Sequence, residues 1–193
     1  MARGVLRAAA ATLLALTVLC GVAYPVVVTA TARLCFAWQA DGSLIRARDG
    51  RVIGSAWVGQ PFRARGYFWG RPSAVAGDAR TSGGRNLGPR NPALIAAVTT
   101  RVAAMREADP AHRAPVPVDL VTASASGLDP DISPAAARYQ APRVAEARGL
   151  SVLQVEQLID DHVEARVLGV LGEPRVNVLR LNLALDALGA GPR

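Results

Sequence analysis

The chain has 193 residues, with 22 basic residues against 15 acidic ones, and every basic residue is an arginine. Because P-loops, protein kinases and Schiff-base enzymes each need a lysine, these classes are excluded. About 160 residues remain once an apolar N-terminus is set aside, which is enough for one soluble domain with a core.

The N-terminal segment is apolar, with 25 uncharged residues between Arg7 and Arg33. As a helix at about 1.5 Å per residue, it exceeds the roughly 30 Å hydrocarbon core of a bilayer. We therefore expect a transmembrane helix over residues 8–32, preceded by a cytoplasmic tail, residues 1–7. Pro25 is expected to kink this helix rather than end it, because neighbouring helices can satisfy the freed carbonyl.

The residues at the two ends of this segment indicate its placement. Two arginines precede it, and a domain of this size crosses a membrane largely regardless of its own charge, so we expect residues 33–193 to form a soluble domain outside. Phe36 and Trp38 follow Arg33 closely, and we expect them at the level of the lipid headgroups, where aromatic side chains are common. A cleaved signal peptide is the alternative, since residues 30–32 resemble a cleavage site, although such a peptide usually has an apolar region of only about 7 to 15 residues.

The cysteines and histidines predict neither a disulfide nor a metal site. Cys20 and Cys35 would be about 22 Å apart along a helix, too far for a disulfide bond. His112 and His162 are scattered. Because two distant cysteines and two scattered histidines do not make a zinc site, no metal is expected.

A hairpin and a long irregular segment are expected after the apolar segment. Short alternating runs flank Asp49-Gly50, which predicts a hairpin. From Arg63 to Arg90, a segment that we call the basic excursion, six arginines accompany Asp78 alone. Together with aromatic residues 67–69 such a stretch can bind nucleic acid. On an outer, membrane-anchored domain, docking on a partner protein or on lipid headgroups fits better, so we expect no nucleic acid.

Helices and strands alternate in the rest of the sequence. Asn91-Pro92 is expected to start an amphipathic helix that stops at Asp109-Pro110. Val116 to Thr122 is expected to be a strand. Ser151 to Gln154 form a capping box for a further helix, and after a glycine-containing break a last strand runs into a short terminal helix. The predicted fold is one N-terminal transmembrane helix followed by a single mixed α/β (α+β) soluble domain.

Small hydroxyl residues, aspartates and prolines are concentrated between Val121 and Ala145. Hydroxyls can bond nearby backbone where a strand ends, and glycine permits a positive φ. Asp129-Pro130 or Ser133-Pro134 is expected to open a helix, which Pro142 kinks or restarts and Gly149 ends. The expected structural motif consists of Thr122, Ser124, Ser126, Gly127, Asp129, Pro134 and Pro142.

The same region contains the parts of a Ser-His-Asp triad, so an independent membrane-anchored outer-surface hydrolase or binding protein is the alternative function. A Gly-x-Ser-x-Gly elbow is missing, which favours bracing over catalysis, and we expect no catalytic residue. Gln140 is expected to have an amide free to contact a partner or a nucleotide. The triad candidates are Ser124 or Ser126 as nucleophile, His112 or His162 as base, and Asp129 or Asp131 as orienting carboxylate.

Five blocks of sequence carry a resemblance to a known family. They are GYFWGRPSA from Gly66, SGGRNLG from Ser82, NPAL from Asn91, the block Val116 to Ser151, and VNVLRLNLALDAL from Val176. In this order, and over essentially the whole chain, they resemble the C subunit of the Kdp potassium-transporting ATPase, KdpC, which has a single N-terminal span. Departures are confined to loops and arginine-heavy linkers.

The resemblance implies a non-catalytic, single-pass subunit of a complex in the bacterial inner (plasma) membrane, surrounded by lipid. Its partners would be a channel-like potassium-binding subunit and a P-type ATPase subunit. The family's C subunit is thought to stabilise this assembly, and it has been described as a catalytic chaperone that raises the ATP affinity of the ATPase subunit. No bound cofactor is implied, and ATP only through the ATPase subunit. The lysine-free sequence fits, because it cannot contain the Asp-Lys-Thr-Gly phosphorylation signature.

Overall fold

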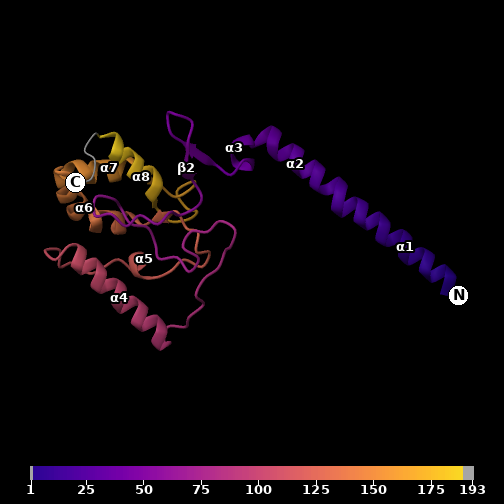
Figure 1. Ribbon diagram of the computed structural model, residues 1–193, viewed down its shortest axis with the longest axis horizontal. Coiled ribbons are helices and arrows are strands. Elements are labelled where there is room, and N and C mark those ends of the chain that lie inside the picture. The colour runs from indigo at the N-terminus through magenta and orange to yellow at the C-terminus, as the bar shows by residue number, and fades with distance from the viewer. Residues whose placement is uncertain (1, 189–193) are drawn as a thin grey trace. The chain divides into compact units, whose positions relative to one another are not determined.

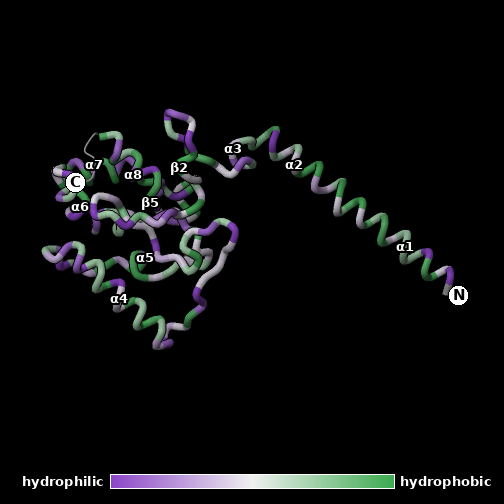
Figure 2. Tube along the Cα trace, in the orientation of Figure 1, coloured by the Kyte–Doolittle hydropathy of each residue, from purple (hydrophilic) through white to green (hydrophobic). Residues whose placement is uncertain are grey.

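The computed structural model describes residues 2–188, and the chain divides after Leu44 into two compact units. In the first unit, one long helix passes through a π-helical turn, and Figure 2 shows that most of it is apolar. Among the described residues one segment, Arg3–Cys35, is long and apolar enough to cross a membrane. The elements are α1 (Ala2–Val18), η1 (Leu19–Ala23), α2 (Tyr24–Cys35) and the short α3 (Ala37–Ala40).

The helix continues past Pro25, which lies in the first turn of α2. A proline lacks the N–H that would close the α-helical ladder. The π turn η1 lies directly before it, and the Tyr24 N–H bonds to the carbonyl of Leu19 there. The proline is therefore accompanied by a local π turn rather than by the end of the helix, and the helix extends beyond residues 8–32 in both directions.

The second unit begins with the predicted hairpin. β1 (Leu44–Arg46) pairs with β2 (Val52–Ser55), and Gly50 in the turn has a φ of 82°. From Pro61 to the start of the next helix the chain contains no helix or strand, so the basic excursion is irregular, as its composition predicts.

α4 (Pro92–Ala108) begins and ends where expected. The side chain of Asn91 caps it by accepting from the Ala93 N–H at 2.9 Å. None of its residues is fully buried. Four residues of the predicted apolar face are half-buried, and one of them, Met105, packs against the core; the four are Leu94, Val98, Val102 and Met105.

The strand predicted over Val116 to Thr122 is wrong, because the structure has a short helix there, α5 (Val118–Val121). Pro117 has no N–H to offer a sheet ladder. The helical turn places the Asp119 carboxylate where it accepts from the Ser133 N–H at 2.7 Å. A contact 14 residues away along the chain thus outweighs the local alternation.

The core lies between a small sheet and three C-terminal helices, and Figure 1 shows these helices as α6, α7 and α8. α6 packs against α7, and α7 against α8. The three-stranded antiparallel sheet has the order β3-β5-β4, with Ile132 and Val163 both opposite Val176. This is the mixed helix and strand domain that the sequence predicts. The elements are β3 (Asp131–Ile132), α6 (Pro134–Arg148), α7 (Val152–Asp161), β4 (Val163–Glu164), β5 (Arg175–Asn177) and α8 (Val178–Ala187).

α6 shows the expected local signals at both ends. Ser133 caps it by accepting from the Ala136 N–H at 3.0 Å, so Ser133-Pro134, rather than Asp129-Pro130, opens the helix. Gly149 ends it in the left-handed conformation with a φ of 67°. The helix runs through Pro142 without a break. The capping box of the next helix is also present, with Ser151 and Gln154 bonding reciprocally.

Candidate functional site

The turn after α5 is braced by its own hydroxyl groups. Ser124 Oγ accepts from the Gly127 N–H at 2.9 Å, and Ser126 Oγ accepts from the Leu128 N–H at 3.1 Å. Thr122 Oγ1 donates to the Val118 carbonyl at 2.7 Å. Each hydroxyl is thus occupied by nearby backbone, which fixes the shape of the turn.

The basic excursion packs directly on this turn. Ser73 Oγ donates to the Gly127 carbonyl at 2.5 Å, and the Gly83 N–H donates to the Ser126 carbonyl at 2.8 Å. Gly127 has a φ of 69°, and a Cβ atom there would lie 2.7 Å from the Gly83 carbonyl oxygen. Only glycine fits this close approach, so the turn and the excursion form one surface.

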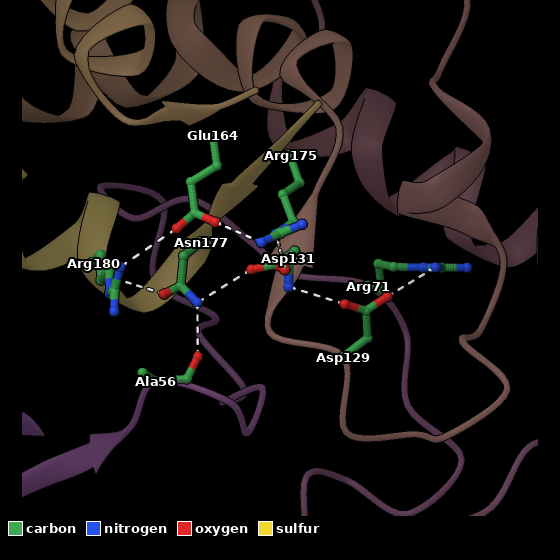
Figure 3. A network of polar contacts seen from close by, with 8 residues as sticks. All are labelled: Ala56, Arg71, Asp129, Asp131, Glu164, Arg175, Asn177 and Arg180. Atoms are coloured by element: carbon green, nitrogen blue, oxygen red, sulfur yellow. Dashed lines mark hydrogen bonds and ion pairs between the residues drawn. The ribbon is translucent and has the colours of Figure 1, made fainter. Parts of the chain in front are cut away.

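An ion-pair network crosses the small sheet next to the turn (Figure 3). Arg175 on β5 pairs with Asp131 on β3 at 3.2 Å and with Glu164 on β4 at 2.7 Å. Asn177 Nδ2 donates to Asp131 and to the Ala56 carbonyl. Burial raises the pKa of Asp131, and the charge of Arg175 opposes this rise. The network also includes Arg71, Asp129 and Arg180.

Two buried amides hold the centre of the excursion. Asn182 on α8 accepts from the Phe68 N–H at 2.8 Å and donates to the Phe68 carbonyl at 3.0 Å. Gln140 on α6 does the same for Trp69, at 2.8 and 3.1 Å. Each amide bonds one backbone unit as a neighbouring strand would, which explains how a segment without regular structure stays ordered.

The expectation of a free amide at Gln140 is therefore wrong. Its side chain is 1% exposed, and its oxygen also accepts from Arg143 at 2.8 Å. A buried amide whose oxygen and nitrogen are both bonded within the chain has no capacity left for a partner or a nucleotide.

Two buried arginines of α6 complete this hold on the excursion. Arg143, 3% exposed, donates to the carbonyls of Arg65 and Tyr67, and its guanidinium lies 4.1 Å from the centre of the Trp69 ring. Arg148 donates from Nε to the Gly66 carbonyl at 2.7 Å. Burial, and then the charge of Arg65, lower the pKa of Arg143 to about 10, so it is charged at neutral pH.

The candidate triad is not assembled. His112 packs edge-on against Tyr139, with ring centroids 4.6 Å apart, and His162 Nδ1 is 2.8 Å from the Leu158 carbonyl. Within residues 2–188 no hydrogen bond joins either histidine to Ser124 or Ser126. The candidate aspartates are instead paired with arginines. The arrangement offers no activated nucleophile.

A pocket of about 240 Å³ lies beside the turn. Arg63 and Arg71 line it together with Ser124 and Gly127. Arg71 pairs with Asp129 at 2.9 Å, yet its Nε is buried without a hydrogen-bond partner among the described residues. Asp129 also lines the pocket, so the charge of Arg71 is balanced there by a carboxylate. No cluster of metal-binding side chains occurs in the described part of the chain.

The remaining predicted residues lie in both units. Pro134 is in the first turn of α6, and Pro142 is half-exposed in its interior. Phe36 directly follows the apolar helix and is exposed, and Trp38 donates from Nε1 to the Leu44 carbonyl at 3.3 Å. The placement of these two aromatic residues at a headgroup level stays a prediction.

Comparison with known proteins gives one consistent result. The family model described as KdpC, K+-transporting ATPase, c chain, matches residues 6–187. The chain belongs to the KdpC family.

Individual relatives agree over almost their full length. A protein of Methylibium petroleiphilum named potassium-transporting ATPase KdpC subunit is 61% identical over 184 residues, or 94% of this chain and 96% of the relative. Proteins of the same name from Methylococcus capsulatus (61% identical, 91% and 94% covered) and Polaromonas naphthalenivorans (58% identical, 96% of each covered) are also similar. KdpC membership makes the chain an accessory subunit of a membrane potassium pump, not its catalytic subunit, and implies partner subunits.

The buried polar residues that order the excursion were not predicted from the sequence. Arg143, Arg148 and Asn182 contact segments at least 76 residues away. The available signal was local: three arginines, two of them buried, lie in the alanine-rich α6, and an asparagine lies within the apolar run of α8. Polar residues on a helix face that is otherwise apolar predict a buried partner.

Proposed function

We propose that this chain is the non-catalytic, membrane-anchored subunit of a high-affinity, ATP-driven potassium uptake complex. In this proposal it stabilises the assembly of a channel-like subunit and a P-type ATPase subunit. The observation that carries the proposal is the match over 94% of the chain to a relative named as the KdpC subunit of a potassium-transporting ATPase.

The internal contacts support a binding role over an enzymatic one. The hydroxyls of the turn, the amide of Gln140 and the guanidinium of Arg143 are all engaged within the chain. Groups engaged in this way hold the fold rigid, so that its surface loses little conformational freedom when a partner docks on it. Because Gln140 is enclosed, an effect on ATP affinity would act through the partner subunits rather than through nucleotide held at this amide.

The topology in this proposal is single-pass in the bacterial inner membrane, with the N-terminus inside and the soluble domain outside. A single cysteine at the exposed position of Ala104, in a background without Cys20 and Cys35, should react with an impermeant thiol reagent on intact cells. Protection of this cysteine until lysis would place the domain inside.

Assembly is tested by purification from membranes in mild detergent. The tagged full chain should retain the channel-like and ATPase subunits encoded beside it, and cells lacking the chain should fail to grow on low potassium. A chain that purifies alone, together with hydrolase activity that Ser124→Ala abolishes, would instead establish the alternative of an independent outer-surface enzyme.

A further inference from the structure

The segment between β4 and β5 carries an exposed aliphatic surface. Within residues 167–171, here called the aliphatic tip, every residue except Gly169 is a large aliphatic residue, and all four side chains are exposed, with Leu168 at 88%. Single exposed apolar residues are ordinary on a protein surface. Four at one tip form a patch, and such patches mark interaction sites.

The backbone of the aliphatic tip is largely satisfied by the tip itself. Val167 and Leu171 exchange two hydrogen bonds of 2.9 and 3.0 Å, and the Val170 N–H donates to the Val167 carbonyl at 3.2 Å. The Gly169 N–H donates to the carbonyl of Arg166 at 3.1 Å. These groups lose no hydrogen bond to water when the tip is covered, so its burial carries little polar cost.

Leu168 occupies a position that does not suit a leucine. Its φ is 53°, in the left-handed region that glycine and asparagine tolerate better. Its side chain packs little within the chain, because it is 88% exposed. A leucine here therefore gives the isolated chain neither packing nor a relaxed turn.

The charges around the aliphatic tip distinguish a protein partner from a lipid surface. Arg166 pairs with Glu173 at 2.5 Å, and Glu164 pairs with Arg175 and Arg180 at 2.7 and 3.4 Å. Anionic headgroups attract unpaired clusters of basic residues, whereas here each basic residue has an acidic partner. An apolar tip whose base carries balanced ion pairs instead suits a protein interface, in which an apolar centre is accompanied by polar groups.

We propose that the aliphatic tip inserts into an apolar recess on a larger protein subunit of the same membrane complex. This inference rests on the proposed function and deepens it, because it names the part of the chain that anchors the partner. The preformed hairpin presents its aliphatic side chains without having to order a loop on binding, which favours affinity.

The first test is crosslinking of the full chain in native membranes that contain the whole complex. A photoreactive amino acid at position 168 should give an adduct with a partner subunit, identified by mass spectrometry. The matched control is position 153 on α7, where Leu153 is 72% exposed but stands outside the aliphatic tip. Adducts with lipid alone, adducts with a second copy of this chain, or equal yields from both positions would overturn the proposal.

The second test separates docking from folding. Leu168→Asn removes the aliphatic side chain and introduces a residue that accepts a positive φ, so the melting temperature should be unchanged or higher. Retention of the partner subunits in mild detergent should fall by about tenfold or more, as expected of a central interface residue. Leu153→Asn is the control and should leave retention unchanged.

The two proposals fail in different ways. If the wild-type chain retains no partner subunit, the proposed function fails. If the wild-type chain retains its partners and Leu168→Asn retains them equally well, only the role of the aliphatic tip is refuted.

Discussion

Buried arginines in this chain bond several backbone carbonyls at once, which a lysine could not do in the same geometry. Arg143 is 3% exposed and bonds two backbone carbonyls and the Gln140 oxygen at once. A planar guanidinium presents several N–H groups in a fixed fork, while an ammonium is a single point of charge. A chain without lysine is thus suited to hold an irregular segment by its carbonyl oxygens.

Replacing this fork tests its contribution. Arg143→Lys should lower the free energy of unfolding by about 1–3 kcal/mol, because at least one buried acceptor is left without a donor. Thermal or chemical unfolding of the full chain in detergent measures the change. Arg138→Lys is the control on the same helix, since Arg138 forms a half-exposed pair with Asp160 that should change stability by no more than about 0.5 kcal/mol. Equal losses in both variants would contradict the buried role.

Asp131 provides a pH-dependent test of the ion-pair network. Its pKa is raised chiefly by burial, while Arg175 lowers it. The folded state therefore binds the proton more tightly than the unfolded state. The stability contributed by this group is fully present below the ordinary aspartate pKa and is lost as the pH rises through the folded-state pKa.

Removing the opposing charge should raise the pKa of Asp131 further. A carboxyl carbon NMR titration should show a larger upward displacement in Arg175→Gln than in the wild type. Arg80→Gln, which removes an exposed arginine paired with Asp78, should leave the titration of Asp131 unchanged. If Asp131 titrates at or below the ordinary aspartate pKa, burial does not raise its pKa in the folded protein.

At the level of elements, α6 acts as the support for the basic excursion. Gln140, Arg143 and Arg148 project from one helix onto the backbone of residues 65–69, and α8 adds Asn182. Helix side chains here replace the neighbouring strand that an extended segment would otherwise need. The rigidity of the excursion thus depends on the integrity of α6.

Pro142 lies inside this helix, where we expect it to lower the stability of the fold. Pro142→Ala should raise the free energy of unfolding by about 1–2 kcal/mol, because an interior proline costs about 3 kcal/mol relative to alanine and only part of this is offset by a more flexible unfolded chain. Pro92→Ala is the control, since Pro92 lies in the first turn of α4, where proline is tolerated and the change should bring no gain. A loss of stability in Pro142→Ala would show that the ring contributes packing that outweighs the missing bond.

Local chemistry was predictable and distant contacts were not. The caps at Asn91 and Ser151 and the end at Gly149 depend on neighbours within a few residues and were identified from the sequence. For the start of α6 the sequence left two candidates, of which the structure has Ser133. The helix α5 and the enclosure of Gln140 depend on partners 14 and 71 residues away. The braced turn could be predicted because its hydroxyls bond adjacent backbone. The side-chain contacts that order the excursion could not, because they depend on the tertiary structure.

At the scale of the whole molecule, the apolar helix determines whether the domain stays attached to a membrane. The segment Arg3–Cys35 has 33 residues. At about 1.5 Å per residue it is roughly 50 Å long, well over the hydrocarbon core, so it can span with tilt or with ends in the headgroup region. The residues that resemble a cleavage site, 30–32, lie inside α2. We therefore expect an uncleaved anchor, so the protein extracted from membranes should have the full mass of 20.1 kDa.

A charge placed near the middle of this helix tests the same expectation through the free energy of membrane insertion. Leu19→Arg should cost about 2.5–3.5 kcal/mol of insertion free energy and reduce the fraction of chain that remains in carbonate-washed membranes. Leu34→Arg is the matched control, because Leu34 is equally apolar but adjoins Arg33 near the end of the helix, where a long cationic side chain can reach the interface. If both variants remained fully in the membrane fraction, the expected cost of a central charge would be wrong. If the extracted wild-type chain lacked its first 32 residues, the helix would be a cleaved signal and the domain would depend on partner contacts alone.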